Sequence, residues 1–212
     1  MSKEINIYTD GSCLKNPGKG GWGIVVILPD GNVEEYSKGY EHTTNSRMEM
    51  IAMYMALKFA EKHSRDKANI HSDSNFIVEA FNKKWLDGWV KKGWKKAKNE
   101  PVANADIWKK IYPLYTKLNV NFIKVKAHSG IEYNEQVDEL ARAAAMGSDL
   151  VADAGYIPND NTKDKDKQKN ENNNIITLEN VLSNGVHSIR IIKGTKTITI
   201  SKQQISEFIN ES

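Results

Sequence analysis

Four acidic residues stand where a folded chain could bring carboxylates together. Asp10 and Asp73 each end a run with the apolar spacing of a strand, and Glu49 and Asp138 lie early in two segments with helical spacing. Parallel neighbouring strands end side by side, at the edge of a sheet where ligand crevices form. Four converging carboxylates would repel one another unless hard divalent cations bound them. Two such ions about 4 Å apart can promote in-line phosphodiester hydrolysis.

Each of these acids also has a purely structural explanation. Asp10 precedes a glycine, and Asp is common in turns. Glu49 could form a capping box with Ser46, and Asp73 could cap the segment that follows it. Asp138 could simply interact favourably with the positive, N-terminal end of its helix dipole. These explanations are separate from one another, whereas a single shared site would account for all four acids.

The predicted elements form an α/β fold that would position these acids. Alternating apolar residues predict strands at 4–10, 21–28, 33–40, 68–73 and 120–128. Helical spacing predicts helices at 44–62, 75–84, 104–117 and 134–146. The tetrapeptide PDGN at 29–32 has the chemistry of a hairpin turn. We therefore expect a five-stranded mixed sheet flanked by helices, in which an antiparallel meander is extended by parallel strands.

Composition limits the classes of protein to consider. The chain has 212 residues, of which 39% are hydrophobic, and its sequence contains no apolar run near the roughly 18 residues of a membrane span. The start, MSKEINIY, lacks the pattern of a secretion signal. The single cysteine, Cys13, cannot form an internal disulfide. These features predict a cytoplasmic protein without a membrane partner.

The composition changes sharply after Ile157. Residues 159–174 hold six asparagines, four lysines, four acids and no apolar residue, which predicts a disordered polar linker over 158–174. Residues 175–212 contain two apolar runs around a Gly-Thr pair, which predicts a hairpin, and Ser201 could start a short helix. We expect a domain at 1–157 that carries the chemistry and a small C-terminal appendage at 175–212. The appendage could contact the body, a second chain or another protein.

One segment is strongly basic. Residues 83–98 contain seven lysines and one acid, Asp87, together with three of the five tryptophans. Such a combination can neutralise phosphates while aromatic faces pack on sugars. The alternative is that the tryptophans belong to the core and the lysines form a solvated face.

Six ordered motifs resemble those of the bacterial type-1 ribonuclease H family over about residues 3–156. They are YTDGSCLKNPGKGGWG, TTNSRMEM, HSDSNF, WLDGWVKKGWKKA, VKAHSG and NEQVDELARAAA. The resemblance implies endonucleolytic cutting of the RNA strand of RNA–DNA hybrids, leaving 3′-hydroxyl and 5′-phosphate ends. It also implies two Mg²⁺ ions per site, with Mn²⁺ as a substitute.

The resemblance assigns roles to particular residues. The family's metal-binding acids correspond to Asp10, Glu49, Asp73 and Asp138. His128, in the loop before the last helix, corresponds to a histidine that shuttles protons or helps product release. The family's basic handle corresponds to 83–98, with substrate contacts expected from Trp85, Trp89, Lys91, Lys92, Trp94, Lys95 and Lys96.

The remaining substrate contacts divide between the two strands of the hybrid. Reading the RNA 2′-hydroxyl is expected of groups at Cys13, Asn16, Asn45 and Asn75. A phosphate of the DNA strand is expected to bind Thr44 and Asn104, with help from Arg47. The chain departs from the family at two positions: Ser46 replaces a common Asn or Gln, and Asn75 is shorter than the usual glutamine. These departures bear on RNA affinity rather than on catalysis.

Other interpretations compete with this one. The segment GKGGWG at 18–23 fits a dinucleotide-binding pattern, but it leads into a strand and not a helix, so we interpret it as a turn with close backbone approach. Cys13 lacks a nearby histidine and is a poor nucleophile. A hybrid-binding module with weak catalysis, or another nuclease or strand-transfer enzyme on the same sheet, remains as an alternative function.

Overall fold

The computed structural model describes residues 4–63, 67–127, 129–158, 176–183, 186–193 and 196–201. Its contacts divide the chain into two compact units, Met1–Ile157 and Pro158–Ser212.

The first unit is built on a mixed sheet with the strand order β5-β4-β1-β2-β3-β6. Three antiparallel strands form the meander: β1 (Ile5–Cys13), β2 (Gly18–Ile27) and β3 (Val33–Thr43). Two strands extend it in parallel beside β1: β4 (Ala68–Ser72) and β5 (Val120–Lys124). The predicted fold class is confirmed.

The prediction of five strands was one strand short. A sixth strand, β6 (Leu150–Val151), pairs in parallel with Gly39 and Tyr40 of β3. Two residues are too few to produce an alternating pattern, so the sequence offered no signal for it. The fifth predicted strand, 120–128, was too long, because β5 ends at Lys124.

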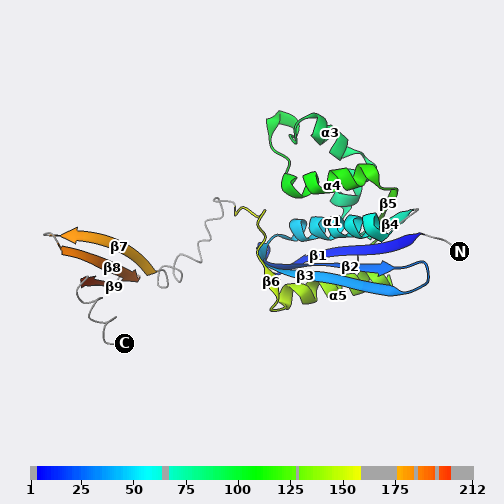
Figure 1. Ribbon diagram of the computed structural model, residues 1–212. Coiled ribbons are helices and arrows are strands. Elements are labelled where there is room, and N and C mark those ends of the chain that lie inside the picture. Colours follow the sequence, from blue (N-terminus) through cyan, green and yellow to red (C-terminus); the bar gives the residue numbers. More distant parts are fainter. Residues whose placement is uncertain are drawn as a thin grey trace. The chain divides into compact units, whose positions relative to one another are not determined.

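Helices cover both faces of this sheet (Figure 1). On one face lies α1 (Asn45–His63), and on the other lies α5 (Glu132–Met146). Helix α4 (Ala105–Lys117) packs on α1, on the side away from the sheet, and α2 (Asn75–Asn82) packs against β4 and β5. The four predicted helices are confirmed, within a few residues at their ends.

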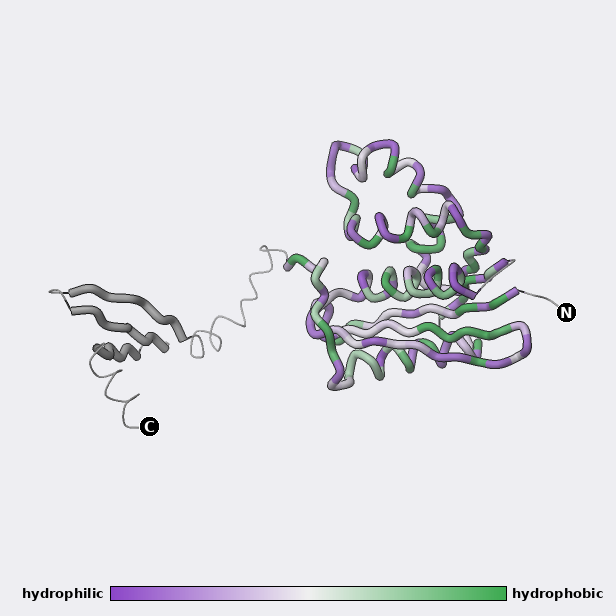
Figure 2. Tube along the Cα trace, in the orientation of Figure 1, coloured by the Kyte–Doolittle hydropathy of each residue, from purple (hydrophilic) through white to green (hydrophobic). Residues whose placement is uncertain are grey.

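Apolar side chains explain why the layers close. Ile5 and Ile7 alternate with half-buried residues along β1, while Ile24, Val25 and Val26 are all buried in β2. Figure 2 shows β2 changing from near-neutral residues at its glycine-rich start to a hydrophobic second half. A continuous apolar run is expected where a strand is covered on both faces.

The glycine-rich start of β2 serves packing. The segment GKGGWG lies inside the strand and not in a turn, so our interpretation of it as a turn was wrong, whereas the close backbone approach is present. A Cβ added at Gly21 would lie 2.4 Å from the Ala141 carbonyl oxygen of α5. Helix α5 can therefore rest directly on the backbone of β2.

The basic segment contains a helix that periodicity did not reveal. Helix α3 (Trp85–Lys91) is followed by a 3₁₀ turn (Ala97–Asn99) and a bridge between Lys95 and Pro101. Seven residues span only about two turns, which is too short for a clear helical pattern.

The second unit contains three antiparallel strands in the order β7-β8-β9. They are β7 (Ile176–Ser183), β8 (Val186–Lys193) and β9 (Lys196–Ser201). The predicted hairpin corresponds to β8 and β9, and β7 was not predicted. Residues 159–174 of the predicted linker, and the helix predicted to follow Ser201, lie outside the described residues.

Candidate active site

Asp10 and Asp73 lie at the same level of the sheet. Strands β1 and β4 pair in parallel, and their last pair is Thr9 with Ser72. Asp10 and Asp73 are each the first residue after that pair. The chain does not turn at residue 11, because β1 continues to Cys13 along β2. The explanation of Asp10 as a turn residue is therefore wrong, and the two aspartates share one edge.

Glu49 reaches this edge because α1 touches β1 backbone to backbone. A Cβ added at Gly11 would lie 2.1 Å from the Glu49 backbone nitrogen. Only glycine leaves room for this approach, which brings the second turn of α1 over the position after Asp10.

Two hydrogen bonds hold the Glu49 carboxylate. The Asn45 amide Nδ2 donates to Oε1 at 3.0 Å, and the Ser74 hydroxyl donates to Oε2 at 2.9 Å. The capping-box alternative is wrong, because α1 begins at Asn45 and Ser46 lies inside the helix. Asp73 does not cap α2 either, because the N-cap is Ser74.

Burial and the neighbouring acids both act on the carboxylates of Asp10 and Glu49. Burial, reinforced by the charges of Asp73, Asp138 and Glu49, raises the pKa of Asp10 to about 8, although the Gly11 N–H lowers it in part. Burial and the charge of Asp73 also raise the pKa of Glu49, against the hydrogen bonds from Ser74 and Asn45. Charges act at this strength only over short distances. The four predicted acids therefore gather in one place, from β1, α1, the end of β4 and α5.

The donor set fits a hard divalent cation. All four acids are only partly buried and offer carboxylate oxygens, which are the ligands that Mg²⁺ prefers and supplements with water. Within the described ranges, no three His, Cys, Asp or Glu side chains lie in an arrangement that could hold a metal ion as it stands. The fit to a divalent cation therefore rests on the chemistry of the four carboxylates.

The residues predicted to read RNA lie next to this edge. The Asn45 backbone N–H donates to the Asn16 side-chain oxygen at 3.1 Å, which joins two of them. The Cys13 thiol contacts the carbonyls of Gly18 and Thr43, at 3.7 and 3.4 Å. Asn75 is exposed at the first position of α2. His128 lies outside the described residues, so its predicted role stays a prediction.

The residues predicted to bind a DNA phosphate meet at Arg47. Its backbone N–H donates to the Thr44 hydroxyl at 3.4 Å, and its Nη1 donates to the Asn104 side-chain oxygen at 3.4 Å. The Arg47 side chain is only 4% exposed and forms ion pairs with Asp106 and Asp153. The guanidinium is therefore committed to carboxylates, and the predicted help of Arg47 to a phosphate can only be indirect.

The basic segment, residues 83–98, has exposed lysines and partly buried tryptophans, so each of the two interpretations of its sequence applies in part. Its lysines are exposed, including Lys91, Lys92, Lys95 and Lys96. Its tryptophans are half-buried: Trp85 packs against Phe76 and Trp89, and Trp89 also contacts Trp108. Trp94 meets Tyr112 edge to face. The rings thus support this segment, residues 83–98, which we call the arm, and the lysines form its outer surface.

Sequence reasoning missed several polar residues of the site. Ser74 binds Glu49, and Asp106 and Asp153 bind Arg47. Ser74 directly follows Asp73, which is the only local signal. Asp106 and Asp153 are separated from Arg47 by 59 and 106 positions, so only the fold reveals these pairs.

Comparison with known proteins agrees with this geometry. The RNase H family model matches residues 2–146, which is more than half of the chain. The chain belongs to the ribonuclease H family. A ribonuclease H of Lachnoclostridium phytofermentans is 44% identical over 155 residues, which cover 71% of this chain and 97% of that protein. Membership of the ribonuclease H family makes this chain a nuclease of a group that generally uses divalent metal ions.

Solved ribonuclease H structures share the fold. LC9-RNase H1, a type 1 RNase H with the type 2 active-site motif, is similar with a TM-score of 0.59 and 26% identity, over 73% of this chain and 80% of that one. LC11-RNase H1 in complex with RNA/DNA hybrid is similar with a TM-score of 0.50 and 29% identity, over 67% and 96%.

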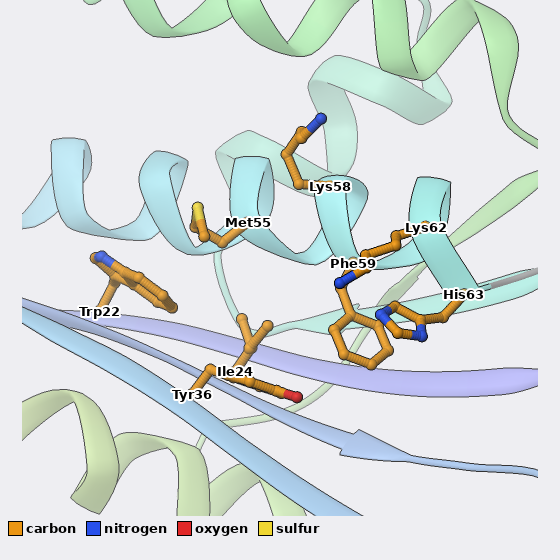
Figure 3. Close-up of a pocket in the computed structure, with 8 residues that line it drawn as sticks. All are labelled: Trp22, Ile24, Tyr36, Met55, Lys58, Phe59, Lys62 and His63. Atoms are coloured by element: carbon orange, nitrogen blue, oxygen red, sulfur yellow. The ribbon is translucent and has the colours of Figure 1, made fainter.

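An apolar pocket of about 280 Å³ lies away from the ribonuclease H site (Figure 3). Trp22, Ile24 and Tyr36 of the meander line one side of it, and Met55 and Phe59 of α1 line the other. Phe59 is ten positions after Glu49, or about 15 Å along the helix. The pocket is therefore separate from the acids.

Among the described residues, no helix is long and apolar enough to cross a membrane.

Proposed function

We propose that this chain cuts the RNA strand of RNA–DNA hybrids by metal-assisted hydrolysis, leaving 3′-hydroxyl and 5′-phosphate ends. The observation that carries the proposal is the electrostatic coupling of Asp10 to Asp73, Glu49 and Asp138 at one edge of the sheet. Such mutual repulsion is costly without a cation, and it supports a site that binds metal ions.

The four acids would bind the metal ions that the reaction needs. Two Mg²⁺ ions, with Mn²⁺ as a substitute, would supply an activated water and stabilise the leaving oxygen. The charges of the other three acids all act on Asp10, so we infer that it contributes to holding both ions. Asn45 and Ser74 fix the Glu49 carboxylate, so that its oxygens keep one orientation. His128 would move a proton near the leaving group or assist product release.

Specificity for a hybrid requires separate contacts to its two strands. Asn16, Asn45, Cys13 and Asn75 border the acids, where they could read 2′-hydroxyls of the RNA strand. Thr44 and Asn104 would hold a DNA phosphate, and the exposed lysines of the arm would neutralise further phosphates. The solved complex of LC11-RNase H1 with RNA/DNA hybrid supports the same substrate.

The remaining expectations extend this proposal. Residues 1–157 would form the catalytic domain, and residues 175–212 a separate module that contacts the body, a second chain or another protein. A cytoplasmic location would fit a substrate that forms on intracellular DNA.

A cleavage assay on matched duplexes tests the function. We expect Mg²⁺-dependent cutting of an RNA–DNA hybrid, and none of RNA–RNA or DNA–DNA duplexes of the same sequence. Cutting of DNA–DNA would instead indicate another nuclease on this fold.

Two variants test the site. Asp10→Asn and Asp73→Asn each remove a charge and almost no volume, so both should fold normally and lose cleavage. Asp149→Asn is the matched control, because its carboxylate is 89% exposed and pairs only with Lys38 among the described contacts. Near-normal cutting by Asp10→Asn would refute the assignment of the site.

A further inference from the structure

The apolar pocket between the meander and α1 is open to solvent on one side (Figure 3). It forms because α1 packs chiefly on β1 and β2, so the neighbouring part of β3 is not covered by the helix. Trp22 and Ile24, which line the pocket from β2, are buried, whereas Tyr36 of β3 is 43% exposed. An apolar side chain that entered this pocket would leave water and would cover the Tyr36 ring, and both changes are favourable.

The size of the pocket suits one bulky side chain. Its volume of about 280 Å³ lies just below the range of about 300–1,000 Å³ for sites that enclose drug-sized ligands. Aromatic rings form much of its wall, and the ring centroids of Tyr36 and Phe59 lie 5.6 Å apart in a tilted arrangement. Such walls favour a flat or branched apolar group, such as the side chain of Phe, Leu or Ile.

The mouth of the pocket is charged unevenly. Three basic side chains line it on the helix side: Lys58, Lys62 and His63. Lys58 pairs with Glu61 at 2.7 Å, whereas Lys62 forms no ion pair with any carboxylate in the part of the chain that the structure describes. On the sheet side, the Tyr36 hydroxyl donates to the Glu34 carboxylate at 2.6 Å. The carboxylates of a ligand therefore belong beside α1 and not beside β3.

We propose that this pocket is a docking site for another protein, which inserts one bulky apolar side chain and places flanking carboxylates beside Lys58 and Lys62. A single apolar anchor in a pocket, with charges around it, is a common arrangement at protein interfaces. The inference goes beyond the proposed function, because no residue of the pocket is assigned to cleavage. Phe59 lies about 15 Å along α1 from Glu49, so a bound partner would hold the nuclease without covering its acids.

Binding of a synthetic peptide to the full-length protein tests the proposal. The probe is fluorescein-labelled Ser-Asp-Glu-Phe-Leu-Glu-Asp-Ser, measured by fluorescence polarisation. A matched peptide with Ser in place of Phe and Leu keeps every charge and should bind at least about tenfold more weakly, because it buries no apolar side chain. A second matched peptide, with Asn and Gln in place of the acids, should also bind more weakly, and the difference between it and the probe should shrink in high salt.

Variants of the protein locate the binding site. Lys62→Glu should weaken binding of the probe about tenfold, because it places a like charge beside the carboxylates of the peptide. Tyr36→Ala removes the exposed ring and should also weaken binding about tenfold. Lys109→Glu is the matched control, because it makes the same change of charge at an exposed position of α4, and it should alter binding less than about twofold. All three variants should keep the melting temperature and the cleavage rate of the wild-type protein.

Competition experiments distinguish a protein partner from other occupants. An unlabelled RNA–DNA hybrid should not displace the probe, because the pocket is separate from the acids. Octanoate, a small molecule with one apolar chain and one carboxylate, should not displace it at the concentrations at which the unlabelled peptide does. Sedimentation of the protein alone should show no association that Lys62→Glu abolishes.

Several results would overturn the inference. They include no saturable binding of the probe, equal binding by wild type, Lys62→Glu and Tyr36→Ala, and equal binding of the peptide that lacks Phe and Leu. Displacement by the hybrid would assign this surface to the nucleic acid, and displacement by octanoate would make the pocket a small-molecule site. Self-association that depends on Lys62 would make the occupant a second copy of this chain.

Discussion

Replacing Asp10 by Asn should stabilise the metal-free protein while it abolishes cleavage. A carboxyl whose pKa is 3.8 when unfolded and about 8 when folded takes up a proton on folding between those pH values. Stability therefore falls as pH rises from about 4 to 8, and the carboxyl lowers the free energy of unfolding by about 4 kcal/mol at pH 7. Water and side-chain movement relax part of this cost, so we expect a measured gain of about 2 kcal/mol or more in the variant.

Tryptophan fluorescence provides the assay. The five tryptophans all lie between positions 22 and 108, so their emission follows the first unit alone. Thermal unfolding in EDTA should show the Asp10→Asn protein melting about 5 °C or more above wild type at pH 7, with little difference near pH 4. Mg²⁺ should narrow the gap, because the cation relieves the repulsion in wild type.

If Asp10→Asn is no more stable than wild type in EDTA at pH 7, or if the difference does not depend on pH, then burial and the neighbouring acids do not raise the pKa of Asp10 as inferred. Asp149→Asn should show no such gain and serves as the control for simple removal of a negative charge.

Three further outcomes are expected. His128→Ala should slow turnover in the cleavage assay without abolishing it, since metal-activated water remains; complete loss would indicate a structural role. Alanine at four exposed lysines of the arm, Lys91, Lys92, Lys95 and Lys96, should weaken hybrid binding. The slope of the logarithm of the binding constant against the logarithm of the salt concentration should become shallower by about 0.9 or somewhat less per lost contact. An unchanged slope would place the phosphate contacts elsewhere. A protein ending at Ile157 should fold and cut hybrid, as measured by fluorescence melting and steady-state kinetics; insoluble or inactive protein would make the tail part of the fold.

Local patterns were sufficient to predict the long elements. The alternation around Ile5 and Ile7 predicted β1, and helical spacing from Met48 onward predicted α1, because burial imposes these periods on the sequence. The end of β1 could not be predicted, since Gly11 pairs with Trp22 on one side although the pairing with β4 has already ended. One strand can thus end for one neighbour and continue for the other.

Contacts between distant segments were beyond the reach of local patterns. The resemblance to the ribonuclease H family implied that Arg47 helps to bind a DNA phosphate, and only the fold shows that two aspartates occupy its guanidinium. The sequence likewise favoured substrate contact for the tryptophans of the arm and left a place in the core as the alternative, whereas the fold packs Trp89 against Trp108. Whether a charge is buried, and which aromatic rings pack together, depends on tertiary structure. An apolar repeat of two residues in a strand or 3.6 residues in a helix does not encode either.

The backbone contact at Gly11 also bears on how sequence conservation in such enzymes should be read. A methyl group at this position would lie 2.1 Å from the Glu49 nitrogen and would push α1 away from β1. Natural selection would therefore hold this glycine as firmly as the aspartate before it, for reasons of space and not of chemistry. An alignment alone would score the two positions alike. Comparing Gly11→Ala with Asp10→Asn would separate them, because the first loses stability together with activity and the second loses activity alone.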